Sequence, residues 1–153
     1  MKRIMFVCHG NICRSPMAEL VFKDLLAKRG LQDAFLVRSS ATSTEELGNP
    51  VYPPARAELA RHGIDCAGKR AVQLRADDYD KYDLFVGADS ANIRNMRRLF
   101  DGDPEGKVCL LLSFAGEQGD VADPWYTGNF ALTYTDVLRG CSALLEQLTR
   151  TNA

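Results

Sequence analysis

The chain has little of what metal sites, membrane spans and nucleic-acid surfaces are made of. It contains 2 histidines in 153 residues, so a histidine-based metal site is not expected. Acidic and basic residues nearly balance at a formal net charge of −1, which provides no global basic field for nucleic acid. The apolar run before Cys8 spans only residues 4–7, too short for a signal-peptide core or a membrane span. We therefore expect no metal, no other cofactor, no nucleic-acid partner and no membrane association.

Cysteine usage and length limit the protein further. The 5 cysteines are an odd number, and their spacings match neither a secreted disulfide framework nor a paired zinc motif. A reduced, cytoplasmic protein is therefore expected. A chain of 153 residues without repeats or low-complexity tracts fits one domain, residues 1–153, with a core of its own. For the oligomeric state, the expectation is a monomer or a weak dimer.

Apolar runs and amphipathic stretches alternate along the chain. The patterns predict strands at 3–7, 34–38, 82–88 and 108–113, and helices at 16–29, 53–62, 90–100 and 129–149. This alternation favours an α/β fold with one parallel sheet of about four strands and helices on both faces. The carboxyl ends of parallel strands meet at one edge, where ligands collect. The polar residues that follow these strands, Cys8, Ser39, Asp89 and the 120–126 loop, are therefore expected to share a site.

The most informative segment follows the first strand and reads Val-Cys-His-Gly-Asn-Ile-Cys-Arg-Ser-Pro over residues 7–16. A strand, a tight loop and a helix start direct several backbone N–H groups and a positive helix end at one point, which suits a phosphate-sized anion. Cys8 lies in the same field, which favours the thiolate, a nucleophile for phosphorus. The planar fork of Arg14 can hold two phosphate oxygens. We expect the following residues to bind phosphate: His9, Gly10, Asn11, Ile12, Cys13 and Arg14.

Each part of this segment, taken alone, has an ordinary structural explanation. Cys8 alone would be a buried core cysteine. Gly10 and Asn11 alone would form a strand-to-helix turn, since both tolerate left-handed backbone. Ser15 alone would be a helix N-cap, with Pro16 at the first helical position. The order and spacing of these residues on one strand–loop–helix unit favour the catalytic interpretation.

A long loop before the last helix supplies candidate proton donors: Glu117, Asp120 and Asp123. Displacing an alkoxide or phenoxide from phosphorus is slow unless the leaving oxygen receives a proton. Pro124 stiffens the backbone after Asp123, and Trp125 and Tyr126 add apolar bulk that would dry the site. Beside an anionic phosphate, such a carboxyl should hold its proton better. By spacing alone, a plain Asp-Pro turn explains this motif equally well.

Positions 8 to 16 match the loop of the low-molecular-weight protein tyrosine phosphatases, Cys-x-Gly-Asn-x-Cys-Arg-Ser-Pro, throughout. Other segments resemble landmarks of that family in the right order: 39–42, 48–50, 61–64, 89–92 and 123–126. The resemblance covers nearly the whole chain. It implies a protein tyrosine phosphatase that hydrolyses aryl phosphate monoesters through a cysteinyl-phosphate intermediate. The implied partners are phosphotyrosine proteins or small aryl phosphates, and the implied inhibitors are phosphate and vanadate-like anions.

The resemblance also implies the catalytic roles. Asp123 is the general acid, and afterwards the base that activates water against the phosphorylated Cys8. Arg14 and the loop amides stabilise the equatorial oxygens in both steps. A second thiol, Cys13, lies in the same loop, and the recurrence of this cysteine pair in the family implies a reversible disulfide after oxidation.

Further residues are implied as support. Ser15 is expected to hydrogen-bond the sulfur of Cys8. Asn11 and Ser39 are expected to brace the loop from below, and Asp89 is expected to support the residues that touch the substrate. Trp125, Tyr126 and the residue at position 45 are expected to line the substrate cleft.

The chain departs from the family's pattern at three positions. His9 follows the cysteine where many members have leucine, and either contacts substrate or is solvated. Glu45 stands where several members place an aromatic residue, and Gly68 where histidine is frequent. Substrate preference therefore stays open.

Three alternatives to a tyrosine phosphatase remain. Arsenate reduction on the same scaffold needs a close cysteine pair after the third strand, but residues 86–98 contain none. In the protein-arginine phosphatases, whose loop resembles this one, threonine stands at the position of Ile12. A non-catalytic phosphate-binding module would not need the complete set of Cys8, Arg14 and Asp123.

Overall fold

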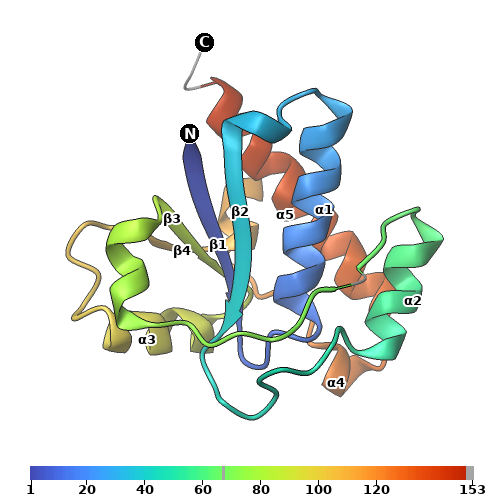
Figure 1. Cartoon of the computed structure of the whole chain (residues 1–153), viewed down its shortest axis with the longest axis horizontal. Helices are drawn as coiled ribbons and strands as arrows, with labels where there is room; N and C mark the ends of the chain where they lie inside the picture. The colour runs from blue at the N-terminus through green and yellow to red at the C-terminus, as the bar shows by residue number, and fades with distance from the viewer. Residues whose placement is uncertain (67, 151–153) are drawn as a thin grey trace.

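The computed structural model describes residues 1–66 and 68–150, which form one parallel sheet covered by helices (Figure 1). The sheet order is β2-β1-β3-β4, and every neighbouring pair is parallel. The strands are β1 (Lys2–Cys8), β2 (Phe35–Ala41), β3 (Leu84–Gly87) and β4 (Val108–Leu110). The α/β fold with a four-stranded parallel sheet is thus confirmed.

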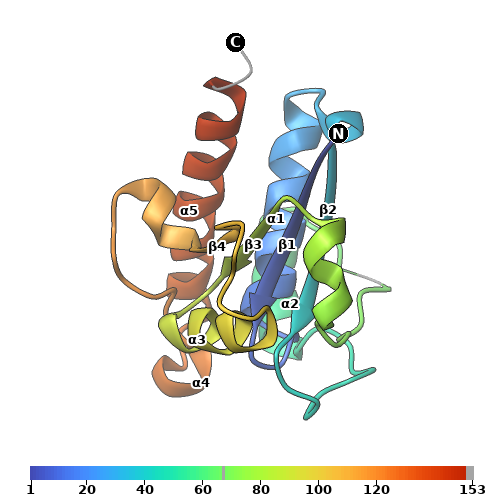
Figure 2. The ribbon, with the colours of Figure 1, turned by 90° about the vertical axis from the view of Figure 1, so that its left-hand side faces the viewer.

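Helices cover both faces of this sheet. They are α1 (Arg14–Lys28), α2 (Pro53–Arg61), α3 (Ser90–Leu99), α4 (Pro124–Thr127) and α5 (Phe130–Arg150). Short 3₁₀ turns occur at Gln32–Ala34, Ala76–Lys81 and Leu111–Ala115. In Figures 1 and 2, α1 and α5 run side by side along the sheet. None of the described helices is long and apolar enough to span a bilayer.

The side chains of β1 alternate between two hydrophobic cores, as they must in a strand. Ile4 and Phe6 pack in the core that contains the buried faces of α1 and α5. Met5 and Val7 pack in a second core with residues of β3 and α3. This central strand therefore holds its carboxyl end rigidly between two layers.

Several predicted boundaries were wrong. The fourth strand ends at Leu110, because the apolar residues that follow it form a 3₁₀ turn and bury Leu111 and Leu112 in the core. The third strand is shorter than predicted, and the second extends to Ala41. The first helix begins at Arg14 instead of Pro16, with Cys13 as its N-cap residue.

Candidate active site

The carboxyl end of β1 opens into a cleft of about 560 Å³. The cleft brings together residues that are far apart in the sequence, such as Cys8 and Asp123. Of the residues expected to form the site, the cleft is lined by Cys8, His9, Gly10, Asn11, Ile12, Cys13, Arg14, Glu45, Asp89, Asp123, Trp125 and Tyr126. Ser15 and Ser39 are buried behind the loop, where they bond to Asn11.

Three hydrogen-bond donors converge on the sulfur of Cys8. The backbone N–H groups of Asn11 and Ser15 donate to Sγ at 3.3 and 3.4 Å, and the Ser15 hydroxyl lies 3.0 Å away. Asn11 has a left-handed backbone with φ of 58°, which turns its N–H inward toward the sulfur. Donors to a thiolate stabilise the charged form, so this geometry suits a nucleophilic sulfur.

The side chain of Asn11 fixes the position of Ser15. Its Nδ2 donates to the hydroxyls of Ser15 at 2.7 Å and Ser39 at 3.0 Å. Its Oδ1 accepts from the backbone N–H of Val72 at 3.1 Å, which sets the direction of the amide. Because Ser15 Oγ accepts from Asn11, its own proton is available for the sulfur of Cys8.

A buried carboxylate completes this orientation. Ser39 Oγ donates to Glu19 Oε1 at 2.6 Å, and Glu19 is only 5 % exposed. An ionised carboxylate only accepts, so Ser39 gives its single proton to Glu19 and must accept from Asn11. Glu19 was not predicted as a site residue. A lone glutamate in the first helix looks like solvated surface in the sequence.

Ser15 is not the N-cap of α1, contrary to the simple reading of Ser-Pro as a helix start. No side chain caps this helix, and the Ser15 hydroxyl turns toward Cys8 and Asn11. No side chain at the N-cap therefore accepts a hydrogen bond from the backbone N–H groups of the first turn.

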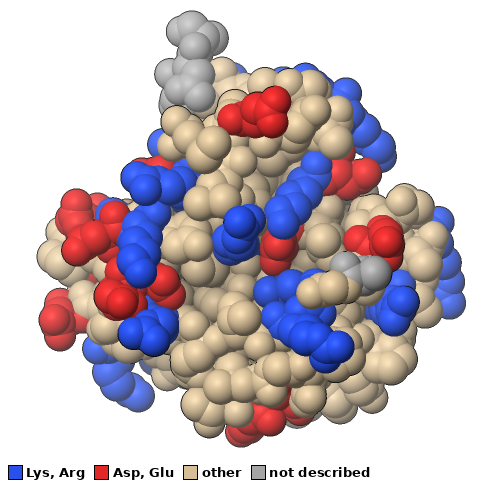
Figure 3. All heavy atoms as spheres, viewed as in Figure 1, with Lys and Arg blue, Asp and Glu red and all other residues tan. Residues whose placement is uncertain are grey.

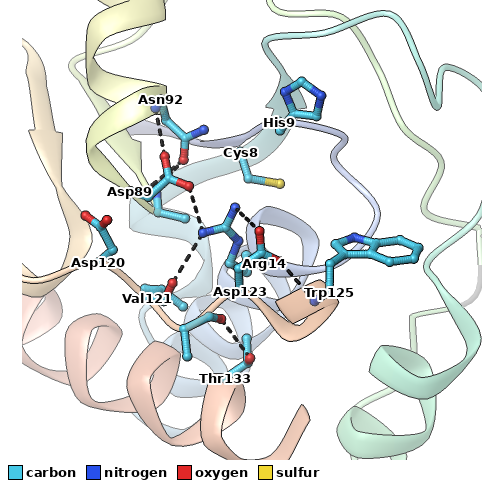
Figure 4. A network of polar contacts seen from close by, with 12 residues as sticks. Cys8, His9, Arg14, Asp89, Asn92, Asp120, Val121, Asp123, Trp125 and Thr133 are labelled. Atoms are coloured by element: carbon cyan, nitrogen blue, oxygen red, sulfur yellow. Dashed lines mark hydrogen bonds and ion pairs between the residues drawn. The ribbon is translucent and has the colours of Figure 1, made fainter. Parts of the chain in front are cut away.

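The guanidinium of Arg14 lies under the cleft and holds three segments together (Figure 4). Nη1 lies 2.9 Å from Asp89 Oδ2 and donates to the carbonyl of Val121 at 3.2 Å, and Nη2 lies 3.5 Å from Asp123 Oδ2. Burial acts to lower the pKa of Arg14, but the negative charges of Cys8, Asp89 and Asp123 outweigh it and raise that pKa above its usual value. The fork is thus permanently charged and preoriented.

Asp123 and Asp89 each begin a helix at the cleft. Asp89 Oδ1 accepts from the N–H of Asn92 at 2.8 Å as the N-cap of α3, and its other oxygen faces Arg14. Asp123 Oδ1 accepts from the N–H of Trp125 at 3.0 Å as the N-cap of α4. Both carboxylates are therefore anchored by one oxygen and present the other to the site.

Two residues of α5 that the sequence analysis missed hold the loop before Asp123. Asp136 accepts from the N–H of Ala122 at 2.9 Å, and the hydroxyl of Thr133 donates to the carbonyl of Ala122 at 2.9 Å. Both are buried, Thr133 fully so. Their signal was a pair of polar residues three apart on the apolar face of the last helix.

The rim of the cleft is more open than predicted. Trp125 is 59 % exposed and Tyr126 89 % exposed, so they form a wall and do not enclose the site. Trp125 stacks on Tyr52 with ring centroids 4.7 Å apart. On the opposite rim, His9 Nε2 lies 3.0 Å from Glu45 Oε2.

The cysteines are all free, and the structure places Cys8 and Cys13 together at the cleft. The others, Cys66, Cys109 and Cys141, lie outside its lining. Within residues 1–66 and 68–150, no three His, Cys, Asp or Glu side chains are grouped as metal ligands.

Comparison with known proteins agrees with this geometry. Residues 3–153 match the family model of the low molecular weight phosphotyrosine protein phosphatases. The chain is 36 % identical over 147 residues to the low molecular weight protein-tyrosine-phosphatase YfkJ of Bacillus subtilis, covering 95 % of this chain and 94 % of that protein.

Solved structures show the same likeness. The crystal structure of YfkJ superposes with a TM-score of 0.96 at 35 % identity, covering 100 % of this chain and 98 % of YfkJ. SP-PTP, a low molecular weight protein tyrosine phosphatase of Streptococcus pyogenes, gives 0.86 at 37 % identity, covering 97 % and 93 %. The Drosophila arginine phosphatase DARP gives 0.86 at 26 % identity, covering 97 % and 98 %. The chain therefore belongs to the low molecular weight phosphotyrosine protein phosphatase family.

Proposed function

We propose that the protein hydrolyses aryl phosphate monoesters, phosphotyrosine in proteins among them, through a cysteinyl-phosphate intermediate on Cys8. The observation that carries this proposal is the convergence of three hydrogen-bond donors on Cys8 Sγ in a cleft that Arg14 and Asp123 also line. A stabilised thiolate, a guanidinium fork and a carboxyl group are the parts that this chemistry needs.

In the first step, the thiolate of Cys8 attacks phosphorus and the bond to the leaving oxygen breaks. Asp123 gives its proton to that oxygen. The contact of Arg14 Nη2 with Asp123 Oδ2, at 3.5 Å, is longer than that of Nη1 with Asp89, at 2.9 Å, so the substrate phosphate can displace Asp123 from this half of the fork. The phosphate charge then favours the protonated carboxyl of Asp123.

In the second step, the carboxylate of Asp123 takes a proton from water as the water oxygen attacks phosphorus. The sulfur–phosphorus bond breaks, which restores the Cys8 thiolate and releases inorganic phosphate. Arg14 Nη1 stays on Asp89 at 2.9 Å, so the fork keeps its orientation in both steps. Phosphate and vanadate-like anions should inhibit, because they would fill the same cradle.

Turnover of p-nitrophenyl phosphate tests the proposal. We expect activity that excess chelator leaves unchanged, because the proposed chemistry uses only a thiolate, a carboxyl group and fixed donors. Cys8→Ser should abolish turnover yet still bind phosphate or vanadate, because Arg14 and the loop amides remain. Appreciable turnover by Cys8→Ser would overturn the assignment of the nucleophile.

The alternative activity that must be distinguished from tyrosine phosphatase activity is the hydrolysis of phosphoarginine. The sequence resemblance places threonine at position 12 in that branch, whereas Ile12 offers no hydroxyl to orient water or a guanidinium. Phosphoarginine and phosphotyrosine should be compared as substrates under the same conditions. Faster turnover of phosphoarginine would assign the chain to the other branch.

A further inference from the structure

A second cleft, of about 590 Å³, lies along β2, one of the two edge strands of the sheet. Its walls are α1, β2 and residues 68–75, and it shares no lining residue with the active-site cleft. We call it the β2 cleft. Figure 3 faces this side of the molecule and shows Lys and Arg gathered over β2, α1 and the segment that crosses them.

The lining of the β2 cleft is strongly basic in a protein with a net charge of −1. Two carboxylates line it, those of Glu19 and Asp78. Its cations come from all three walls: Lys23, Arg38, Lys69, Arg70 and Arg75. A concave surface with such an excess of positive charge attracts anions, and guanidinium forks suit phosphate oxygens.

Two buried polar atoms in the wall of the β2 cleft lack hydrogen-bond partners within the described part of the chain. They are Ser40 Oγ and Gln73 Oε1, and Ser40 is only 1 % exposed. Buried polar groups are almost always paired, so unpaired ones indicate a partner that the protein itself does not supply. The hydroxyl of Ser40 can donate to an anion, which is independent of the charge argument, whereas Gln73 Oε1 only accepts and needs a donor such as water or a protonated phosphate oxygen.

The β2 cleft is connected to the nucleophile loop through Lys69. Lys69 Nζ donates to the carbonyl of Ser39 at 3.1 Å and lies 3.6 Å from Glu19 Oε1, while Lys23 Nζ donates to Glu19 Oε2 at 2.6 Å. Glu19 is the carboxylate that orients Ser39 and, through Asn11, the hydroxyl facing the nucleophile. Two cations of the cleft thus share the carboxylate at the end of this chain of hydrogen bonds.

The ammonium group of Lys69 also interacts electrostatically with the nucleophile. Burial lowers the pKa of Lys69, and the negative charges of Glu19 and Cys8 act against that change. An anion bound in the β2 cleft would draw this ammonium group away from the carbonyl of Ser39 and from Glu19 Oε1, and so disturb the carboxylate that orients Ser39.

We propose that the β2 cleft is an effector site for small oligophosphate anions, separate from the substrate cleft, and that an anion bound there lowers turnover through Lys69 and Glu19. An oligophosphate fits better than a single phosphate, because the cations lie on three walls and the volume is that of a small-molecule site. The effect on turnover rests on the proposed phosphatase activity, whereas binding does not.

Calorimetric titration with inorganic tripolyphosphate tests the binding. The wild-type protein should show two binding events, one for each cleft. Arg38→Gln with Arg75→Gln changes two exposed lining residues outside the catalytic site and should weaken one event at least tenfold. The matched control, Arg29→Gln with Arg98→Gln, removes the same charge elsewhere on the surface and should keep both events. A single event that neither double variant changes would overturn the proposal.

Steady-state kinetics with p-nitrophenyl phosphate test the coupling. Tripolyphosphate should lower kcat severalfold at saturating substrate in the wild type and in the control, but not in Arg38→Gln with Arg75→Gln. Purely competitive inhibition, equal in all three proteins, would mean that the anion acts only at the substrate cleft and would overturn the proposal. If the protein showed no turnover, the proposed function would be refuted. The calorimetric titration would still show whether the β2 cleft binds the anion.

A parallel titration with ATP separates two sources of the ligand. Equal affinity for ATP and tripolyphosphate would assign recognition to the phosphate chain alone. Tighter binding of ATP, lost in Arg38→Gln with Arg75→Gln, would assign the site to a nucleotide. Orthophosphate should bind more weakly than either ligand at the event that Arg38→Gln with Arg75→Gln weakens. If orthophosphate bound there more tightly than both ATP and tripolyphosphate, an oligophosphate site would be contradicted.

Discussion

Oxidation of the nucleophile loop should be reversible, but the protective disulfide should form slowly at neutral pH. Cys13 ends the loop that Cys8 begins, and both are buried free thiols. Burial, followed by the negative charges of Cys8 and Asp123, raises the pKa of Cys13 from 9.0 to about 12, against the opposing charge of Arg14. Peroxide would convert the Cys8 thiolate to a sulfenic acid. Only the Cys13 thiolate can then attack that sulfur, forming the disulfide and expelling hydroxide.

The raised pKa sets an upper limit on the delay, because the part of it that is due to the negative charge of Cys8 disappears when Cys8 becomes an uncharged sulfenic acid. At about pH 7, a thiol with a pKa near 12 is roughly 0.001 % ionised, against roughly 1 % for a pKa near 9. The greater nucleophilicity of the more basic thiolate recovers about 15- to 30-fold of this thousandfold deficit. Closure should therefore be slower than for an ordinary thiol by up to about 30- to 60-fold, and should accelerate about tenfold per pH unit.

A peroxide pulse stopped with catalase separates oxidation of Cys8 from closure. The 8–13 cross-link is then followed over time by mass spectrometry at several pH values, and activity is recovered with a dithiol. In Cys13→Ser, the cross-link should be absent and further peroxide should carry Cys8 to sulfinic acid. Closure at the same rate across about two pH units would refute the reasoning, because a thiol with the raised pKa cannot behave so. Unchanged recovery in Cys13→Ser would show that Cys13 merely packs beneath the loop.

Three further substitutions test the roles proposed for the substrate cleft. Arg14→Lys should lower kcat/KM by about 100-fold or more, since one ammonium cannot replace a fork, and a near-normal value in steady-state assays would contradict the clamp. Asp123→Asn should slow phenyl phosphate far more than p-nitrophenyl phosphate, because the poorer leaving group needs the proton, and equal losses would mean that Asp123 is not the donor. Glu45→Lys should reverse the preference between phosphotyrosine peptides flanked by lysine and by glutamate, by a severalfold change that added salt reduces. An unchanged ratio of the two kcat/KM values would show that Glu45 does not contact the peptide.

The parts of the site that lie close together in the sequence were predictable. A strand, a five-residue loop and a helix place Cys8 and Arg14 by local geometry alone, and the structure brings both to one cleft. Asp89 and Asp123 were predictable for another reason, since parallel strands end at one edge of the sheet. Both carboxylates do face Arg14.

The parts that depend on contacts across the molecule were not predictable. Asp136 and Thr133 hold the loop before Asp123 from a helix that follows it, and nothing in their own segment says which backbone they bind. Glu19 and Lys69 meet Ser39 from two segments 50 residues apart in the sequence. Buried polar pairs of this kind are chosen by tertiary packing, so periodicity can mark their place on an apolar helix face but not the groups that they bind.

The role of Ser15 at Cys8, which the family resemblance implied, replaces the N-cap role that its position before proline would favour taken alone. A serine before proline favours an N-cap, and using it there would have placed its oxygen on the N–H groups of the first turn. In the structure the helix has no side-chain cap, and the serine hydroxyl faces the sulfur of Cys8 at 3.0 Å. Leaving a helix start without a side-chain cap costs about 1 kcal/mol, but it leaves the Ser15 hydroxyl for the nucleophile, whose sulfur also accepts from the N–H of Ser15. The local capping rule is broken where the serine serves the sulfur of Cys8, as expected for a site in which stability is given up for function.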